Sequence, residues 1–277
     1  MLFPTLLAVL AASAFAAPQL TIVNDVVIEH ASVEVKPAPA VVNNDASYAY
    51  AVDIYSPTTA STMSCLRSSS YQTVFIRGFT PAGNGVFDTN SVASIRNAYN
   101  AGLGIEVYIT PQPKGNLQGY QQIDALVQGL NQNGITVRSV WIQVTSPANW
   151  PSNPTSNVNF INSMAARARQ SGLTVGIYTN QYDWSQITNN WSTIGSDVLL
   201  WYWNVLGGGV NGETPANFND FRTFGGFKAA SVKQFAQAES LCSLTVNRDV
   251  YVVGIPAKKS SAFFVSDNQI VVGGLGL

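Results

Sequence analysis

Histidine is almost absent from this chain of 277 residues, whose single histidine is His30. It precedes the alternating run at Tyr48 where we expect the folded domain to begin. Without a histidine in that domain, Ser-His-Asp and Cys-His catalysis and histidine-rich metal sites are excluded. The chemistry must therefore rest on carboxylates, amides, arginine and aromatic rings, and we expect neither a metal nor a cofactor.

Charge is scarce as well, because charged residues make up 10% of the chain and the net charge is −1. The expected domain holds eleven Lys and Arg against ten Asp and Glu, with no basic run. Nucleic acid is therefore not an expected partner. A neutral surface rich in Asn, Ser, Gln and Thr suits sugar ligands, and a hydrophobic share of 46% is enough for one sizeable core.

Long apolar runs are missing except at the N-terminus. Residues 1–17 combine an uncharged apolar run with Ala14-Phe15-Ala16, which fits the small-residue cleavage pattern of signal peptides. We predict a signal peptide cut after Ala16 or Ala17, and hence secretion. The alternative, a membrane anchor, needs a longer run of about 18 apolar residues, which no segment has, so we expect no membrane association.

Cysteine occurs twice, as Cys65 and Cys242. In an oxidising compartment a single pair is most simply a disulfide. Because it would close a very long loop, the chain-entropy account gives it a contribution of about 4–5 kcal/mol.

The rest of the chain divides into three parts. Residues 18–46 have little pattern and read as a propeptide or a flexible lead-in. Residues 47–254 form the expected domain. Residues 255–277 are a C-terminal extension, for which an extra strand and a disordered tail both remain open.

Within the domain one theme repeats: a helix-like segment, a glycine, then an apolar strand-like run. Glycines 102, 134 and 172 stand where a helix C′ residue takes a positive φ, and an apolar run follows each of them. Strand-like runs begin near residues 48, 73, 104, 137, 173, 198, 229 and 248. The repeat predicts consecutive βα units, and about eight strands favour an α/β fold with one irregular, TIM-like (β/α) barrel. The glycine run at 207–212 indicates an irregular loop over the barrel mouth.

Functional side chains of such barrels come from the carboxyl ends of the strands. Those ends offer Asp53, Arg77, Tyr108, Gln143, Thr145, Tyr178, Trp201, Trp203 and Gln234. A carboxylate among amides and aromatic rings suits glycoside chemistry, in which Asp or Glu act as acid and base. Of the six tryptophans we place Trp141 and Trp201 in the core. For Trp150, Trp184 and Trp203, stacking on a sugar and core packing both remain open.

Six runs in order resemble the barrel strands of glycoside hydrolase family 25, most closely its nematode, or protist-type, lysozymes. They are Ala51–Ile54, Val74–Gly78, Trp141–Pro147, Gly176–Asn180, Leu200–Trp203 and Lys233–Phe235. The resemblance spans residues 48–253. It implies an irregular β/α barrel, secretion, and cleavage of the muramic acid–glucosamine bond of peptidoglycan in digestion or innate defence.

The resemblance carries over to only part of the family's site. Asp53 matches the aspartate that ends the first strand. The family's Asp-x-Glu, which supplies the general acid on the fourth strand, is replaced by Gln143 and Thr145, which share one face. The family's Val-Asp-x-Asn reads Val246-Asn-Arg-Asp249, which leaves Asp249 two residues displaced. We expect Asp249 to contact the substrate.

Two carboxyl groups could replace the lost acid. Glu106 shares the interior parity of Tyr108, although an ion pair with Arg77 is the more ordinary role for it. Asp183 follows the fifth strand, where a helix N-terminal role competes equally. Asn190 begins an Asn-Trp-Ser sequon, a candidate for glycosylation in a secreted protein.

Two hypotheses follow. The first is a lysozyme that hydrolyses peptidoglycan with Asp53 as its remaining catalytic carboxylate. The second is an inactive lysozyme-derived protein that binds glycans or regulates related enzymes. In both, the partner is bacterial cell-wall glycan and the protein is an extracellular monomer, whether secreted directly or through lysosome-related or gut secretory vesicles.

Overall fold

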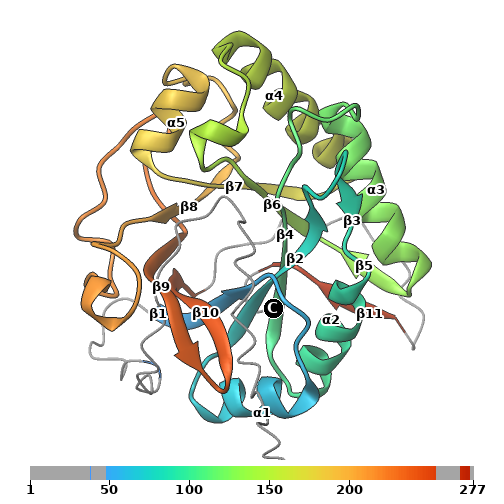
Figure 1. Ribbon diagram of the computed structural model, residues 1–277, viewed down its shortest axis with the longest axis vertical. Helices are drawn as coiled ribbons and strands as arrows, with labels where there is room; N and C mark the ends of the chain where they lie inside the picture. The colour runs from blue at the N-terminus through green and yellow to red at the C-terminus, as the bar shows by residue number, and fades with distance from the viewer. Residues whose placement is uncertain (1–37, 39–47, 254–268, 275–277) are drawn as a thin grey trace, which may run out of the picture.

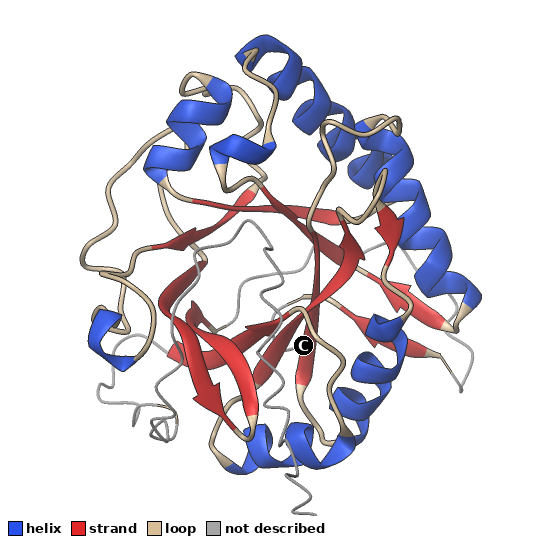
Figure 2. Cartoon of the chain, viewed as in Figure 1, coloured by secondary structure: helices blue, strands red, loops and turns tan. Residues whose placement is uncertain are grey.

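The computed structural model describes residue 38 and residues 48–253 and 269–274. These residues form a closed barrel of eight strands with helices around its outside (Figures 1 and 2). The barrel strands are β1 Tyr48–Ile54, β2 Thr73–Thr80, β4 Gly104–Ile109, β6 Ser139–Gln143, β7 Thr174–Thr179, β8 Leu199–Trp203, β9 Val232–Leu241 and β10 Leu244–Val252. The short strand β3 (Val86–Phe87) pairs with the end of β2.

Seven of the barrel strands follow one another in parallel, and β10 closes the ring. It pairs antiparallel with both β9 and β1, while β1 also pairs in parallel with β2. The closed single-domain barrel confirms the predicted fold class.

Five helices cover the outside of the barrel. They are α1 Ala60–Ser68, α2 Asn90–Asn100, α3 Gly119–Gln132, α4 Pro154–Gln170 and α5 Gln181–Thr188. Glycines 102, 134 and 172 follow the ends of α2, α3 and α4 with φ of 72°, 71° and 77°. The predicted helix–glycine–strand units are therefore confirmed, because each glycine takes the left-handed conformation that ends its helix.

The last unit differs from the prediction of βα repeats. β9 and β10 form an antiparallel hairpin whose two turn residues, Cys242 and Ser243, have φ of 54° and 61°. Cys242 is bonded to Cys65 of α1, with a Cα–Cα distance of 5.8 Å, which confirms the predicted disulfide. A two-residue hairpin usually has Asn-Gly or a similar pair at its turn. This turn has neither residue, so it carries no hairpin signal that could be recognised along the chain.

The connection from β8 to β9 has no α-helix, only the 3-10 turn η2 (Val210–Gly212). Its glycine run is a loop, as predicted, tied to β9 by a hydrogen bond from Gly209 N to Gln237 O. Lys233 of β9 is fully buried under this connection, where Nζ donates to Asp220 Oδ2 at 2.7 Å. A buried ammonium needs such a partner, so the pair fixes the connection against the barrel.

The core has two parts. One lies between the barrel and the helices. The other fills the barrel interior with aromatic rings: Trp201 packs against Phe75 at 4.5 Å and stacks on Tyr178 at 4.0 Å between ring centroids. Trp141 and Trp201 are both buried, which confirms their predicted place in the core.

Part of the C-terminal extension is an extra strand, β11 (Ile270–Val272), paired in parallel with β5 (Ile135–Val137). Gly273 N donates to Ile105 O, and Gly274 N to Ser139 Oγ, so the segment lies at the amino ends of β4 and β6. The predicted signal peptide, the lead-in at 18–46 and His30 lie outside the described residues, apart from residue 38. None of the described helices is long and apolar enough to span a membrane.

Candidate functional site

The site is centred on Asp53, near the carboxyl end of β1. Its side chain is 3% exposed and points into the barrel, opposite Asn247 of β10 in the antiparallel register. Asn247 Nδ2 donates to Asp53 Oδ1 at 2.9 Å, and Gln234 Nε2 of β9 donates to Asp53 Oδ2 at 2.6 Å. Each carboxylate oxygen thus has one amide donor.

Both amides are held in that orientation by their other partners. Asn247 Oδ1 accepts the backbone N–H of Ala238, at the point where a bulge shifts the β9–β10 register. Gln234 Oε1 accepts the hydroxyl of Tyr178 at 3.1 Å. Because each amide oxygen is occupied, the NH₂ groups must face Asp53.

A second carboxyl, that of Asp249, contacts Asp53 from deeper in the barrel. It is fully buried, and Trp201 Nε1 donates to its Oδ1 at 2.9 Å. Burial raises the pKa of Asp53 to about 6, although its amide donors lower it. Burial also raises the pKa of Asp249, well above the usual range, and the charge of Asp53 raises it further. The predicted contact of Asp249 with substrate is wrong, because its side chain has no exposed surface.

Gln143 and Thr145 lie at the end of β6 on one face, as predicted. Gln143 Nε2 donates to Thr145 Oγ1 at 3.0 Å, and Gln143 Oε1 accepts from Thr110 Oγ1 at 2.6 Å. This half-buried chain of amide and hydroxyls can bind polar groups of a ligand. None of its three members can act as a proton donor near neutral pH.

Asp183 stands beside this chain, in the first turn of α5. Its carboxylate accepts the backbone N–H of Ser146 and, at 3.3 Å, Nε1 of Trp203. The side chain is 4% exposed, and burial raises its pKa to about 6 against the effect of those two donors. The helix position is confirmed. The hydrogen bond from the Ser146 N–H brings the carboxyl next to Thr145, the position at which the resemblance implies the family's general acid.

The three tryptophans whose role was left open have different environments. Trp203 is half-buried at the end of β8, and its indole N–H donates to the Asp183 carboxylate. Trp150 is 5% exposed and donates to Thr145 O, and Trp184 is fully buried and donates to Trp191 O. Trp150 and Trp184 therefore belong to the core, which decides between the two roles left open for them.

Glu106 does not join the site. Its carboxylate accepts from Ser139 Oγ at 2.7 Å and from Trp141 Nε1 at 2.8 Å. Ser139 is the first residue of β6, which places the carboxyl toward the amino end of the barrel, away from Asp53. A catalytic role for Glu106 is therefore not supported.

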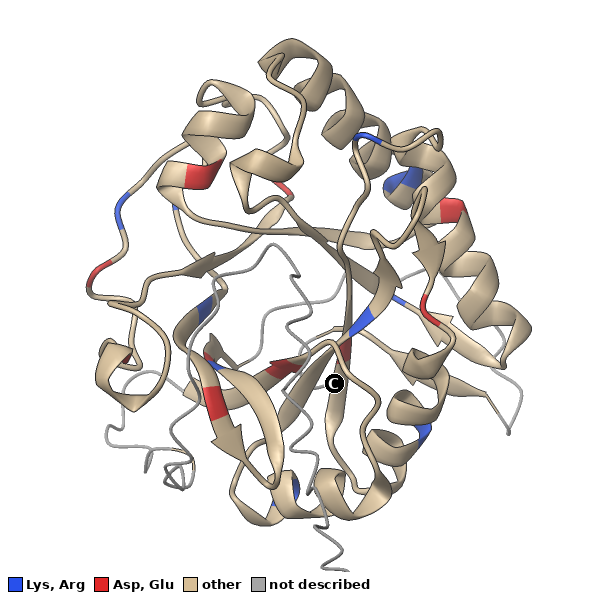
Figure 3. Ribbon diagram, viewed as in Figure 1, with Lys and Arg blue, Asp and Glu red and all other residues tan. Residues whose placement is uncertain are grey.

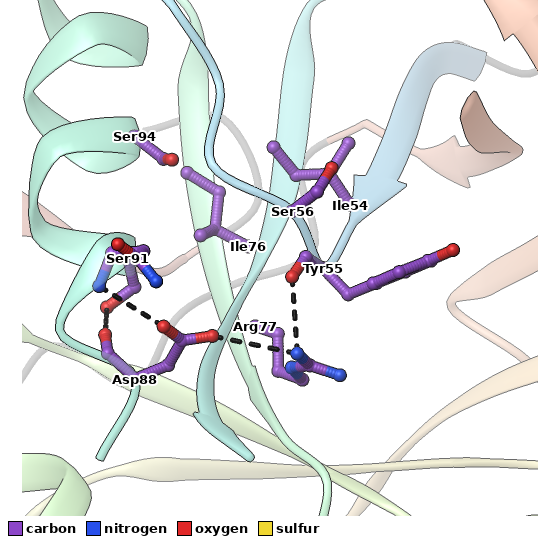
Figure 4. Close-up of a pocket in the computed structure, with 9 residues that line it drawn as sticks. Ile54, Tyr55, Ser56, Ile76, Arg77, Asp88, Ser91 and Ser94 are labelled. Atoms are coloured by element: carbon purple, nitrogen blue, oxygen red, sulfur yellow. Dashed lines mark hydrogen bonds and ion pairs between the residues drawn. The ribbon is translucent and has the colours of Figure 1, made fainter. Parts of the chain in front are cut away.

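Arg77 forms an ion pair with Asp88 at 3.7 Å. The expected partner was Glu106, so that prediction is wrong. The Arg77 guanidinium also donates to Tyr55 O at 3.2 Å and lies 5.4 Å from the Tyr55 ring centre (Figure 4). Beside them is a cavity of about 10 Å³, lined in part by Ser91 and Ser94. That is room for one water and not for a sugar.

Tyr108 and Tyr178 lie under the site rather than at its surface. Both are nearly fully buried; Tyr108 donates to Ile54 O at 3.3 Å, and Tyr178 to Gln234. Burial raises the pKa of both hydroxyls well above the usual range, so they are donors. Tyr178 orients Gln234, and Tyr108 holds the backbone of the residue that follows Asp53. The predicted substrate contact of these two tyrosines is not supported, because both are buried.

Comparison with known proteins decides the family. A family model described as lysozyme-like protein 1 matches residues 44–235. Lysozyme-like protein 1 of Caenorhabditis elegans is 71% identical over 252 residues, 88% of this chain and 85% of that protein. The probable GH family 25 lysozyme 2 of Dictyostelium discoideum is 32% identical over 202 residues, 72% of this chain and 89% of that protein. The chain belongs to the lysozyme-like family of glycoside hydrolase family 25.

Solved structures agree with the fold of this lysozyme-like chain. The bacterial lysozyme of Streptomyces coelicolor matches with a TM-score of 0.59 at 20% identity, over 76% of this chain and 94% of that one. A family GH25 lysozyme of Aspergillus fumigatus gives 0.59 at 14% identity, over 76% and 96%. At such identities the likeness concerns the barrel alone.

Three contributors to the lysozyme-like site were missed from the sequence. Asn247 lies in the Val246–Asp249 motif, but the acidic residue of that motif was predicted in its place. Thr110 and Tyr55 each stand directly after the last residue of a strand, which was the available signal. Tyr55 is 56% exposed and so presents an aromatic ring at the rim.

The remaining predictions concern charge and surface. Lys and Arg are spread over many elements among acidic residues (Figure 3). The described residues contain no group of three or more His, Cys, Asp or Glu able to hold a metal ion. Asn190 is exposed, in a turn with φ of 59°, so its glycosylation stays a prediction.

Proposed function

We propose that this chain is a secreted lysozyme that hydrolyses the glycan strands of bacterial peptidoglycan in digestion or innate defence. The observation that carries the proposal is the buried Asp53 carboxyl at the barrel mouth, oriented by the amides of Asn247 and Gln234. Active sites of such barrels lie at this end, and carboxyl groups catalyse glycoside hydrolysis. The lysozyme names of its relatives and the disulfide, typical of exported proteins, support it.

In this proposal Asp183 donates the proton to the leaving-group oxygen. It is the carboxyl beside Thr145, and a pKa of about 6 leaves a fraction protonated near neutral pH. Asp53, ionised, stabilises the positive charge that develops on the sugar. Gln143, Thr145 and the Trp203 ring hold the substrate.

A second function, glycan binding without cleavage, is favoured by one observation. The hydrogen-bonded chain from Thr110 through Gln143 to Thr145 has no ionisable group. It includes the two positions at which the resemblance implies the family's acid pair. Loss of a general acid typically lowers the rate by about 10²- to 10⁴-fold. Weak cleavage and none at all must therefore be distinguished by experiment.

One experiment separates the two functions. Purified protein is incubated with insoluble peptidoglycan, and new reducing ends and the protein retained on the wall are measured together. We expect the wild-type protein to cleave peptidoglycan. Asp53→Asn and Asp183→Asn should each abolish that cleavage, while both variants are still retained on the wall. Retention without cleavage, followed by activity in a Gln143→Asp/Thr145→Glu variant, would establish the binding-only function. If there is neither, both are wrong.

A further inference from the structure

Asp249 has a buried oxygen whose hydrogen-bonding partner decides its charge. Its Oδ1 accepts from Trp201, whereas no N–H or O–H donor of another described residue reaches its Oδ2. The group in contact with Asp249 is the Asp53 carboxyl. Two ionised carboxylates in contact, both buried, repel each other strongly.

Among the described residues, no positive charge is paired with either carboxyl to relieve that repulsion, since no Lys or Arg forms an ion pair with Asp53 or Asp249. The other titratable groups facing the pair are the hydroxyls of Tyr108 and Tyr178, from β4 and β7. Arg77 is the charged group near Tyr108, and it is paired with Asp88. The pair must therefore retain one proton.

The hydrogen bonds show which carboxyl retains it. Both oxygens of Asp53 already accept amide N–H groups whose orientation is fixed by Ala238 and Tyr178. Those donors favour the ionised form of Asp53. Asp249 accepts a hydrogen bond from one donor only, through its Oδ1. A proton on its Oδ2 could be donated to the Asp53 carboxylate.

We propose that Asp249 is a neutral carboxylic acid at pH 7 that donates its Oδ2 proton to the ionised Asp53. It is a positioning residue, because it is fully buried and acts on substrate only through Asp53. With Asn247 and Gln234 it gives Asp53 three donors, so the pair carries a single negative charge at the barrel mouth. The raised pKa values of the two groups agree with this order of ionisation.

The proton is tested without any substrate. In protein labelled with ¹³C at aspartate side-chain carboxyls, the resonances of Asp53 and Asp249 are assigned from the Asp53→Asn and Asp249→Asn variants and followed from pH 4 to pH 9. We expect Asp53 to ionise near pH 6 and Asp249 to remain protonated at pH 7. An ionised Asp249 at pH 7 would overturn the proposal, whatever the protein does to peptidoglycan.

A second arm rests on the proposed hydrolysis. Asp249→Leu removes the donor, which should lower peptidoglycan cleavage about 10- to 100-fold and shift its pH profile, since a hydrogen bond to a charged group is lost. Asp249→Asn should restore most of that loss, because its amide can accept from Trp201 and donate to Asp53. Asp124→Asn is the control and should leave cleavage unchanged, because Asp124 lies on the outer helix α3 and pairs with Arg167 of α4.

The two arms fail in different ways. If no variant or wild-type protein cleaves peptidoglycan, the proposed hydrolysis is wrong, while the carboxyl resonances still decide the charge of Asp249. If Asp249→Asn cleaves as poorly as Asp249→Leu, an ionised Asp249 is required and the proposal is wrong. Circular dichroism of each variant identifies any that fails to fold. In that case the two carboxyl resonances are assigned in the wild type through correlations to the backbone, and the wild-type titration decides alone.

Discussion

Asp183→Asn should change how the stability of the protein depends on pH. The Asp183 carboxyl is 4% exposed and its pKa is raised from 3.8 to about 6. A raised pKa means that the folded state binds this proton more tightly than the unfolded state. Its contribution to stability is therefore complete below about pH 4 and is lost as the pH rises through about 6.

The magnitude follows from the shift. About two pKa units correspond to about 3 kcal/mol in total, of which roughly 2 kcal/mol should be lost between pH 4 and pH 8. The amide introduced by Asp183→Asn does not titrate, so the variant would have no such loss, and its carbonyl oxygen could still accept one of the two N–H donors. In urea unfolding, wild type should therefore lose about 2 kcal/mol more than the variant between pH 4 and pH 8.

The control is Asp124→Asn, which removes the partly exposed ion pair with Arg167. Such pairs contribute at most about 1 kcal/mol, so its difference from wild type should change little with pH. The reasoning is refuted if Asp183→Asn differs from wild type by the same amount at pH 4 and pH 8. In that event, the Asp183 pKa is not raised and its role as the proton donor loses its support.

Three further predictions concern the disulfide, the C-terminal strand and Asn247. A Cys65→Ser/Cys242→Ser variant should lose up to about 5 kcal/mol of stability, measured by urea unfolding; an unchanged midpoint would contradict this. Truncation after residue 268 removes β11 and uncovers Ser139 and the buried end of the barrel, so the melting temperature should fall, and an unchanged value would show that β11 adds nothing. Asn247→Leu removes a donor to Asp53, so the pKa of Asp53 should rise above about 6 in the ¹³C titration, and a lower value would be contradictory.

Much of the fold could be predicted because glycines mark where three of its helices end. Each of Gly102, Gly134 and Gly172 ends a helix with a positive φ, and the next strand begins within a few residues. The β9–β10 hairpin could not be predicted in the same way. Its turn residues, Cys242 and Ser243, adopt positive φ values without the usual glycine or asparagine, and the disulfide holds the turn at α1.

The site could be predicted only as far as strand ends define it. Asp53, Gln143 and Thr145 were found because strand parity and position determine where they point. The indoles of Trp150 and Trp184 are oriented by hydrogen bonds to the carbonyl oxygens of Thr145 and Trp191, and no period in the sequence reports such contacts. The contact of Asp249 with Asp53 depends on the antiparallel direction of β10 and its bulge beside Asn247, both of which are tertiary features.

The release of reducing ends from purified peptidoglycan at pH 6, by wild type and Asp53→Asn in parallel, tests the central claim most directly. Hydrolysis centred on Asp53 predicts release by wild type and none by the variant, with both proteins retained on the wall to the same extent. Equal release by the two proteins, or no release by wild type, would contradict it.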